Sequence, residues 1–119
     1  KERARGDGDE KTRPERAQQE EAYGRINRGC LYRTLGRFDD ALADLDLAVK
    51  LAPRLPDAHY QRANSLRNLG RFDAARQGYV NALQCAPLRA DIHRDQASLA
   101  WEMGEGVAAT GLLDQVLQH

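Results

Sequence analysis

Apolar residues recur every three or four positions along residues 38–51, the spacing that places side chains on one face of an α-helix. Gly36 precedes this stretch and Pro53 follows it. Glycine tolerates the left-handed conformation that ends helices, and proline cannot continue a helix. The pattern therefore predicts a helix over about 22–35, a turn, and a second helix over about 38–51. The buried stripe of the second helix is expected to contain Phe38, Ala41, Leu42, Leu45, Ala48 and Val49.

The same pattern returns 34 residues later. The string Leu-Gly-Arg-Phe-Asp at 35–39 recurs unchanged at 69–73, and residues 22–55 align without a gap to 56–89 with 11 identities in 34 positions. A third unit begins at Ala90 and reaches the last residue. A single helical pair cannot bury its apolar stripe, whereas stacked pairs share a continuous core. We therefore predict three helix–turn–helix units, at 22–55, 56–89 and 90–119.

The units share a set of small and apolar residues at fixed positions. Unit one carries Tyr32, Gly36, Phe38, Ala41, Leu45, Ala48 and Pro53. Unit two carries Ala63, Leu66, Gly70, Phe72, Ala75, Tyr79, Ala82 and Pro87, and unit three Ala97, Gly104, Ala109 and Leu113. This set resembles the tetratricopeptide repeat (TPR). The resemblance implies an all-α, right-handed superhelical solenoid of three units that acts as a non-catalytic protein–protein interaction module. The chain departs from the family at one position. TPR units usually have a bulky residue near the start of the first helix, where this chain has Arg25, His59 and His93.

The two ends of the chain allow more than one interpretation. Residues 1–12 are charged and contain two glycines, so we expect a disordered segment or linker, with the TPR domain at 13–119. Thr12 and Glu15 resemble a capping box that starts the first helix near Arg13, and the alternative is a solvated tail. At the other end, the apolar residues of 107–117 have no following unit to cover them. Either the parent chain continues, or a partner or second copy packs there through self-association.

The overall charge gives no reason to expect nucleic acid or an anionic membrane as a partner. The 18 Lys and Arg balance the 18 Asp and Glu, and no apolar run is long enough for a transmembrane helix. The balance is uneven along the chain, with −1 on residues 1–21, +2 and +3 on units one and two, and −4 on unit three. Only two cysteines are present, which is typical of a reducing compartment and indicates a cytoplasmic protein.

We expect no catalytic residues, no metal and no cofactor. His93, Asp95 and His119 have the residue types of an iron site. Residues two apart on a helix point to nearly opposite sides, so we interpret these side chains as helix surface. The sequence contains no nucleophile elbow, phosphate-binding loop or carboxylate pair with recognisable spacing.

The resemblance instead implies a binding groove, because the first helix of each TPR unit lines the concave face. A mixture of aromatic, amide and guanidinium groups there suits an extended peptide. The candidate peptide-binding residues are Asn27, Arg33, Tyr60, Gln61, Asn64, Arg67, Arg94 and Trp101.

Three of these candidates have alternative roles. Arg33 and Arg67 lie one period apart and are suited to a ligand carboxylate, or they pair with acidic residues of adjacent helices. Trp101 occupies the equivalent position in unit three, where it lines the groove or belongs to the core.

Some TPR domains hold the C-terminal carboxylate of chaperone tails with basic and amide residues. The matching positions here are Ile26, Cys30, Gln61, Asp91 and Asp95. Two acids at positions that need bases argue against this specificity. The alternative to peptide binding is a structural or oligomerising segment of a larger protein, or the accessory domain of an enzyme.

Overall fold

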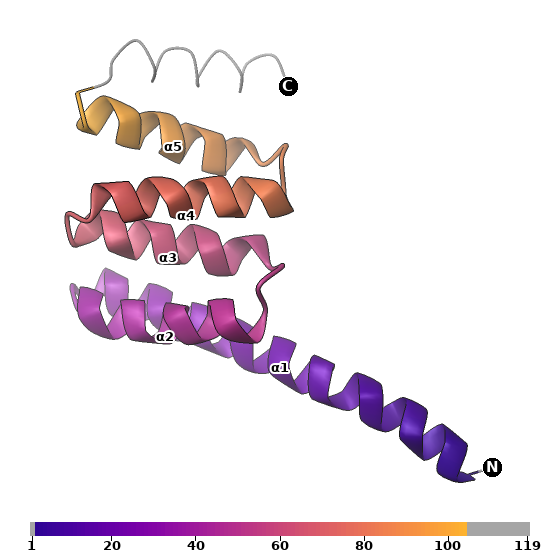
Figure 1. The fold of residues 1–119 in the computed structure, drawn as a ribbon. Coiled ribbons are helices and arrows are strands. Elements are labelled where there is room, and N and C mark those ends of the chain that lie inside the picture. Colours follow the sequence, from indigo (N-terminus) through magenta and orange to yellow (C-terminus); the bar gives the residue numbers. More distant parts are fainter. Residues whose placement is uncertain (1, 105–119) are drawn as a thin grey trace.

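The computed structural model describes residues 2–104, and it describes side chains from residue 15 onward. This part of the chain is a stack of antiparallel helices (Figure 1). The helices are α1 (Glu2–Thr34), α2 (Phe38–Leu51), α3 (Pro56–Asn68), α4 (Phe72–Cys85) and α5 (Ala90–Glu102). The pairs α1/α2 and α3/α4 are the first two predicted units, and α5 begins the third. The molecule is therefore an all-α solenoid of helical repeats, as the sequence predicts. The second helix predicted for unit three would fall in 105–119, outside the described residues.

The turns within the units lie where the repeated sequence predicts them. Gly36, Gly70 and Gly104 each follow the first helix of a unit and have positive φ angles of 77°, 78° and 82°. Residues with a side chain rarely adopt this left-handed backbone conformation, so glycine ends these helices with the least strain. The observed bounds of α2 confirm the predicted helix over 38–51.

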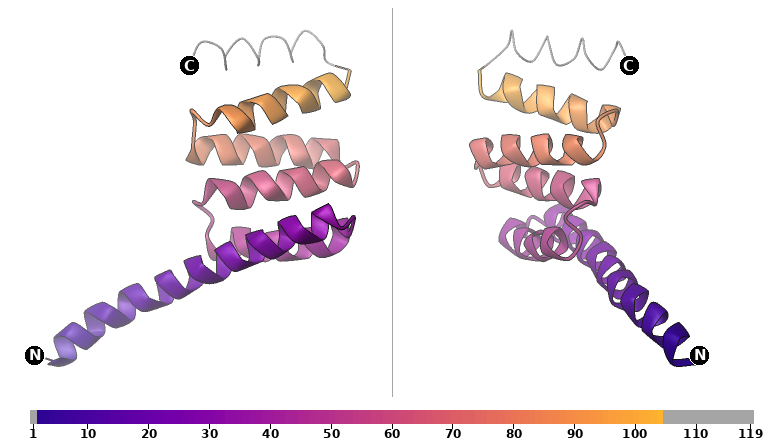
Figure 2. Two further views of the ribbon diagram at one scale, coloured as in Figure 1. Left: turned by 180° about the vertical axis from the view of Figure 1, so that it is seen from behind. Right: turned by 45° about the vertical axis from the view of Figure 1, so that its right-hand side comes forward.

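Helix α1 starts earlier than predicted. The sequence predicts a linker over residues 1–12 and leaves open a helix start near Arg13, whereas α1 already begins at Glu2. Most residues between Glu2 and Lys11 are Glu, Lys, Arg, Ala or Asp, and the first four of these types have high helix propensity. Figure 2 shows that the N-terminal half of α1 projects beyond the stack, while its C-terminal half packs beside α2.

Small residues let the helices approach closely. Ala41 and Ala48 are fully buried, as predicted for the apolar stripe of α2, and so are their counterparts Ala75 and Ala82 in α4. Two glycines make even closer contacts. A Cβ added to Gly29 would lie 2.8 Å from Cγ of Leu45, and one added to Gly78 would lie 2.8 Å from Cβ of Ala63. The core is therefore formed by close helix–helix contact as well as by large side chains.

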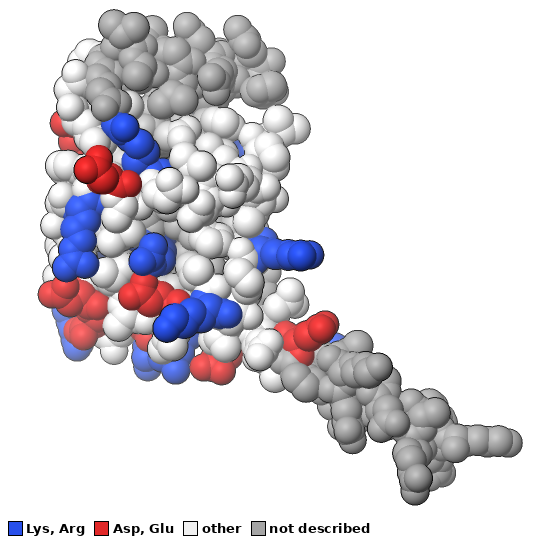
Figure 3. Space-filling view, in the orientation of Figure 1, with Lys and Arg blue, Asp and Glu red and all other residues white. Residues whose placement is uncertain are grey.

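A charged residue interrupts the apolar stripe of α2. Asp44 is buried, and its carboxylate accepts hydrogen bonds from Nε and Nη2 of Arg28, both at 2.7 Å, and from Nη1 of Arg25 at 3.1 Å. The hydrogen bonds from Arg28 hold the pKa of Asp44 below its ordinary value. The arginine that replaces the family's bulky residue in unit one thus compensates a buried carboxylate. Figure 3 shows acidic and basic side chains interleaved over the layer that contains α1 and α2.

Candidate peptide-binding groove

Side chains from the first helices of the three units meet along one face of the stack. Arg33 of α1 donates from Nη1 to Oε1 of Gln61 in α3 at 3.1 Å, and Arg67 of α3 reaches Glu102 in α5. Between these contacts lies a shallow cavity of about 260 Å³. Its lining residues are Arg33, Asn64, Arg67, Asn68 and Asp95.

A chain of amide hydrogen bonds connects two residues that line the cavity, Arg33 and Asn64, to the core. Oε1 of Gln61 accepts from Arg33 and also from Nδ2 of Asn64 at 3.3 Å. Oδ1 of Asn64 in turn accepts from the hydroxyl of Tyr79, a fully buried residue of α4. Burial raises the pKa of Tyr79, so this hydroxyl stays protonated as a donor. Asn64 is therefore oriented by a core residue, and Gln61 by Asn64 and Arg33.

The two groove arginines have different partners. Nε and Nη2 of Arg67 donate to Oε1 of Glu102 at 3.0 and 2.7 Å, and Nη2 also reaches Oγ of Ser98 at 2.8 Å. One period earlier, the residue in the register of Glu102 is Asn68, which has no charge. Arg33 accordingly has only the neutral Gln61 as a hydrogen-bond partner within residues 15–104. The ion-pair alternative thus describes Arg67 but not Arg33 in this part of the chain.

Tyr60 and its acidic neighbours form a second cluster on the same face. The hydroxyl of Tyr60 donates to Oδ2 of Asp95, and burial together with this hydrogen bond raises the pKa of Tyr60. Nη2 of Arg89 binds Asp57 at 3.0 Å and Asp91 at 2.8 Å, and its guanidinium lies 5.8 Å from the ring centroid of Tyr60. Asp91 and Asp95, two of the positions compared above with the chaperone-tail clamp, are therefore both engaged by neighbours.

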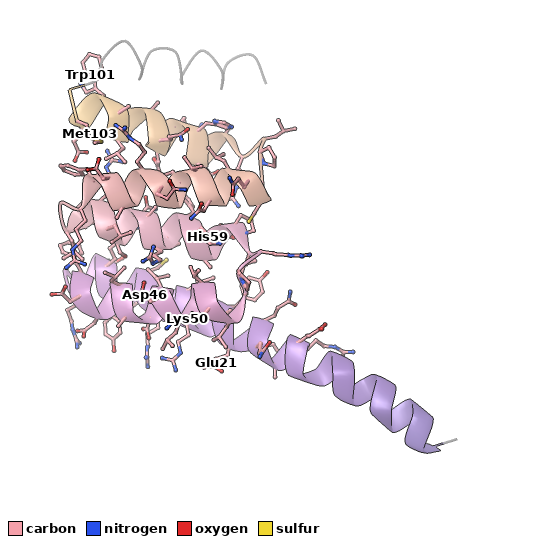
Figure 4. The ribbon with its side chains drawn as sticks, viewed as in Figure 1. Glu21, Asp46, Lys50, His59, Trp101 and Met103 are labelled. Carbon is pink, nitrogen blue, oxygen red and sulfur yellow. The ribbon has the colours of Figure 1, made fainter. Side chains whose placement is uncertain are left out.

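The remaining candidates lie away from the cavity. Asn27 on α1 and Arg94 on α5 are exposed, and neither lines the cavity. Trp101 is 67 % exposed and projects from the last turn of α5 away from α4 (Figure 4). The structure thus groups Arg33, Gln61, Asn64 and Arg67, with Tyr60 beside them, and leaves these three apart.

The structure also reveals groove residues that the sequence analysis did not select. Asn68 and Asp95 line the cavity, and Tyr79 orients Asn64 from below. The repeat register offered a signal for Asn68 and Asp95, because it places both in the first helices of their units, on the face that carries the candidates. A larger hollow of about 680 Å³ lies between residues 15–19 of α1 and the turn 51–55.

The repeated histidines have a structural role at the two joints between units, where α2 is followed by α3 and α4 by α5. Nε2 of His59 lies 2.7 Å from the carbonyl oxygen of Pro53, and Nε2 of His93 lies 2.7 Å from that of Pro87. A carbonyl only accepts, so each Nε2 carries the hydrogen. Within residues 15–104, no three His, Cys, Asp or Glu side chains are grouped in a way that suits a metal ion. His119 of the considered iron site lies outside the described residues.

In the described part of the chain, none of the helices combines the length and apolar composition that crossing a membrane requires. This holds for α1 as well, whose 33 residues are rich in charge.

Solved structures with the same fold include three that share between 15 % and 23 % sequence identity with this chain. The first TPR of Spaghetti (RPAP3) bound to an HSP90 peptide, SRMEEVD, aligns with a TM-score of 0.79 and 17 % identity over 84 % of this chain and 81 % of that one. A MamA mutant aligns with a TM-score of 0.73 and 23 % identity over 88 % of this chain and 79 % of that one. MamA residues 41 to the end from Desulfovibrio magneticus RS-1 align with a TM-score of 0.76 and 15 % identity over 79 % of this chain. In that last case the chain spans 53 % of the solved protein.

A comparison with curated proteins finds no match. The family model of the tetratricopeptide repeat, in contrast, matches residues 26–91 and again residues 60–118. Together these two matches cover residues 26–118, which include most of each of the three units found from the 34-residue period. The chain therefore belongs to the tetratricopeptide repeat family.

Proposed function

We propose that this protein–protein interaction module binds an extended peptide along the face formed by α1, α3 and α5, with Arg33 as the anchor for a ligand carboxylate. The observation that carries the proposal is the setting of Arg33. Its guanidinium borders the 260 Å³ cavity, and within residues 15–104 only a neutral amide binds it. A guanidinium without an acidic partner favours a carboxylate, which it binds through two parallel hydrogen bonds.

The neighbouring side chains complement the peptide backbone. Gln61 and Asn64 are held in place by Arg33 and Tyr79, so their remaining donors and acceptors are oriented before a ligand arrives. Preorganised polar groups lose little entropy on binding. Asn27, Arg94 and Trp101 lie away from the cavity, and a longer peptide would contact them through its ends.

The charge of the units favours one type of ligand. Units one and two carry +2 and +3, and unit three carries −4. A peptide with an acidic segment over the first two units and a basic segment over the third complements this gradient. The peptide bound to the Spaghetti (RPAP3) domain, SRMEEVD, contains such an acidic segment, which supports this class of ligand for a TPR groove.

Selection from a random-peptide library against the protein tests the proposal. The same selection is run on an Arg33→Ala/Arg67→Ala variant and on Arg54→Ala, which changes an exposed arginine in the turn between α2 and α3. We expect acidic peptides to be enriched on the wild type and on Arg54→Ala, and to be lost on the double variant. The proposal fails if a protein shown to be folded by circular dichroism enriches no peptide, or enriches peptides that ignore both groove arginines. That result favours the structural or oligomerising alternative.

A further inference from the structure

Helix α1 exposes the positions that are buried in the corresponding helices of the next two units. In α3, Ala58 and Ser65 are fully buried, and Ala58 packs in the core cluster of unit one. In α5 their counterparts Ile92 and Leu99 are 0 % and 1 % exposed and pack in the core cluster of unit two. In α1 the counterpart of Ser65 and Leu99 is Leu31, which is 57 % exposed. Figure 2 shows that α1 and α2 form the terminal layer of the stack. The helix face defined by Gly24, Arg28, Leu31 and Leu35, called the stacking face below, thus has the register of a joint between units but no helix on it in the described structure.

The two existing joints show which contacts such a face makes. At the first joint, Nε of Arg62 in α3 donates to Oδ1 of Asp46 in α2. At the second joint, Nη2 of Arg76 in α4 lies 3.2 Å from Sδ of Met103, the residue that follows α5. Arg28 is the counterpart of Arg62, and Leu35 is the counterpart of Met103, 34 and 68 residues earlier. A helix seated on α1 in the same way would place a carboxylate beside Arg28 and a side chain beside Leu35.

A preceding unit joined through the ordinary turn does not occupy this face. The turn between units one and two lies at 52–55, and one period earlier the same positions are residues 18–21. Those residues belong to α1, which continues through them without a break. The helix that covers the stacking face must therefore come from elsewhere than a turn at 18–21.

The required chemistry is present in the sequence of unit three. Residues 105–119 lie outside the described part, but the register assigns their positions. Asp114 is the counterpart of Asp46, Thr110 of Leu42 and of Arg76, and Leu117 of Val49. The net charges of −4 on unit three and +2 on unit one also attract each other.

We propose that the stacking face of α1 binds residues 105–119 of a second copy of the chain, in a head-to-tail arrangement. Asp114 of the second copy pairs with Arg28, whose side chain is 54 % exposed beyond its contacts with Asp44. Leu31 and Leu35, 57 % and 61 % exposed, become buried. Because the two surfaces differ, the contact is heterologous and leaves one of each free, so it builds chains of copies rather than closed dimers. This assembly uses residues outside the groove, so it stands or falls separately from peptide binding.

Cross-linking tests the register of this contact. In a Cys30→Ala/Cys85→Ala background, one protein carries Leu35→Cys and another Thr110→Cys, the counterparts of the Met103–Arg76 contact. The control pairs Thr110→Cys with Leu88→Cys, since Leu88 is 71 % exposed but lies in the turn between α4 and α5. We expect a disulfide-linked heterodimer for the first pair in at least tenfold excess over the control. Equal yields for the two pairs, with both backgrounds folded by circular dichroism, overturn the proposal.

Sedimentation of the unmodified protein tests the assembly itself. We expect its weight-average mass to rise above the 13.3 kDa of one chain as the concentration increases. Leu31→Glu/Leu35→Glu and Asp114→Arg should each keep the mass at one chain, whereas Leu88→Glu should leave the assembly unchanged. A wild type that stays at the mass of one chain at every concentration contradicts the proposal, as does assembly that survives the Leu31→Glu/Leu35→Glu change.

Discussion

The guanidinium of Arg67 binds the carboxylate of Glu102 through two nitrogens, at 3.0 and 2.7 Å to the same oxygen. The two residues come from α3 and α5, so this ion pair crosses the candidate groove. A ligand carboxylate that uses Arg67 has to displace Glu102, whereas one that uses Arg33 displaces only a neutral amide. The pair therefore weakens one of the two arginines as a ligand site.

Replacing Glu102 should strengthen peptide binding. Glu102→Gln removes the competing carboxylate, and partly exposed ion pairs of this kind contribute up to about 1 kcal/mol. We expect the affinity for an acidic peptide to rise about twofold to fivefold, measured by calorimetric titration or fluorescence anisotropy. Asp73→Asn, an exposed acid at the start of α4, is the matched control and should change the affinity much less. Equal gains for both variants would assign the effect to net charge instead of to Arg67.

Gly78 should tolerate no larger residue, whereas Gly24 should accept one. A Cβ at Gly78 meets Cβ of Ala63 at 2.8 Å and its Cα at 3.3 Å, so the helices must move apart. We expect Gly78→Ala to lower the free energy of unfolding by about 1–2 kcal/mol. At Gly24 nothing lies within 4 Å, so Gly24→Ala should raise it by up to about 1 kcal/mol through helix propensity. Urea denaturation followed by circular dichroism measures both, and a stabilised Gly78→Ala protein would refute the close α3–α4 contact.

The buried carboxylate of Asp44 should make the stability depend on pH in the acid range. Its hydrogen bonds to Arg28 and Arg25 lower its pKa in the folded protein from the ordinary 3.8. The stabilisation is therefore fully present above about pH 5 and is lost as the pH falls through the lowered folded pKa.

An Asp44→Asn variant isolates this contribution. We expect it to cost about 2 kcal/mol at pH 7 and to flatten the acid side of the stability curve, since two arginines lose an ionised acceptor. Asp40→Asn, which affects the exposed pair with Arg37, is the control and should cost under about 0.5 kcal/mol. Thermal unfolding between pH 2 and 7 compares the three proteins. Parallel curves for the wild type and Asp44→Asn would show that this carboxylate does not govern acid stability.

Replacing Gly70 by asparagine should lower the free energy of unfolding less than replacing it by alanine. Its φ angle of 78° lies in the left-handed region, where a β-carbon costs about 1–2 kcal/mol. Asparagine adopts this conformation more readily, so we expect Gly70→Asn to cost less than Gly70→Ala in chemical denaturation. Gly36, with a φ of 77°, should give the same order. An inverted order at both positions would mean that this conformation does not decide the cost.

The repeated sequence predicts most of the fold because the features that define it are local. Gly36 and Gly70 end their helices through a backbone conformation, and the apolar period assigns the buried face of α2. The start of α1 was not predictable in the same way. The residues before Arg13 are polar, and polar residues with high helix propensity give no periodic signal.

The sequence predicts which residues belong to the candidate site better than it predicts which partners they contact. The register identifies Arg33 and Arg67 as equivalent, yet their partners differ because Glu102 has Asn68 as its counterpart one period earlier. Comparing the two arginines alone does not reveal this, since the difference lies in the following unit. Asp44 illustrates the same limit: its burial depends on arginines from another helix, and a charged residue gives no sign of it in the sequence.

The histidine contacts between units have a consequence for which peptides the groove selects. His59 and His93 each clasp the carbonyl of the proline six residues earlier at the same distance of 2.7 Å. Each hydrogen bond links a turn to the helix that follows it. The spacing between successive first helices is therefore fixed by the same local contact and does not depend on a bound ligand. The first helices that line the groove are therefore equally spaced along it. It should select peptides by the spacing between their anchoring side chains as much as by the identity of those side chains.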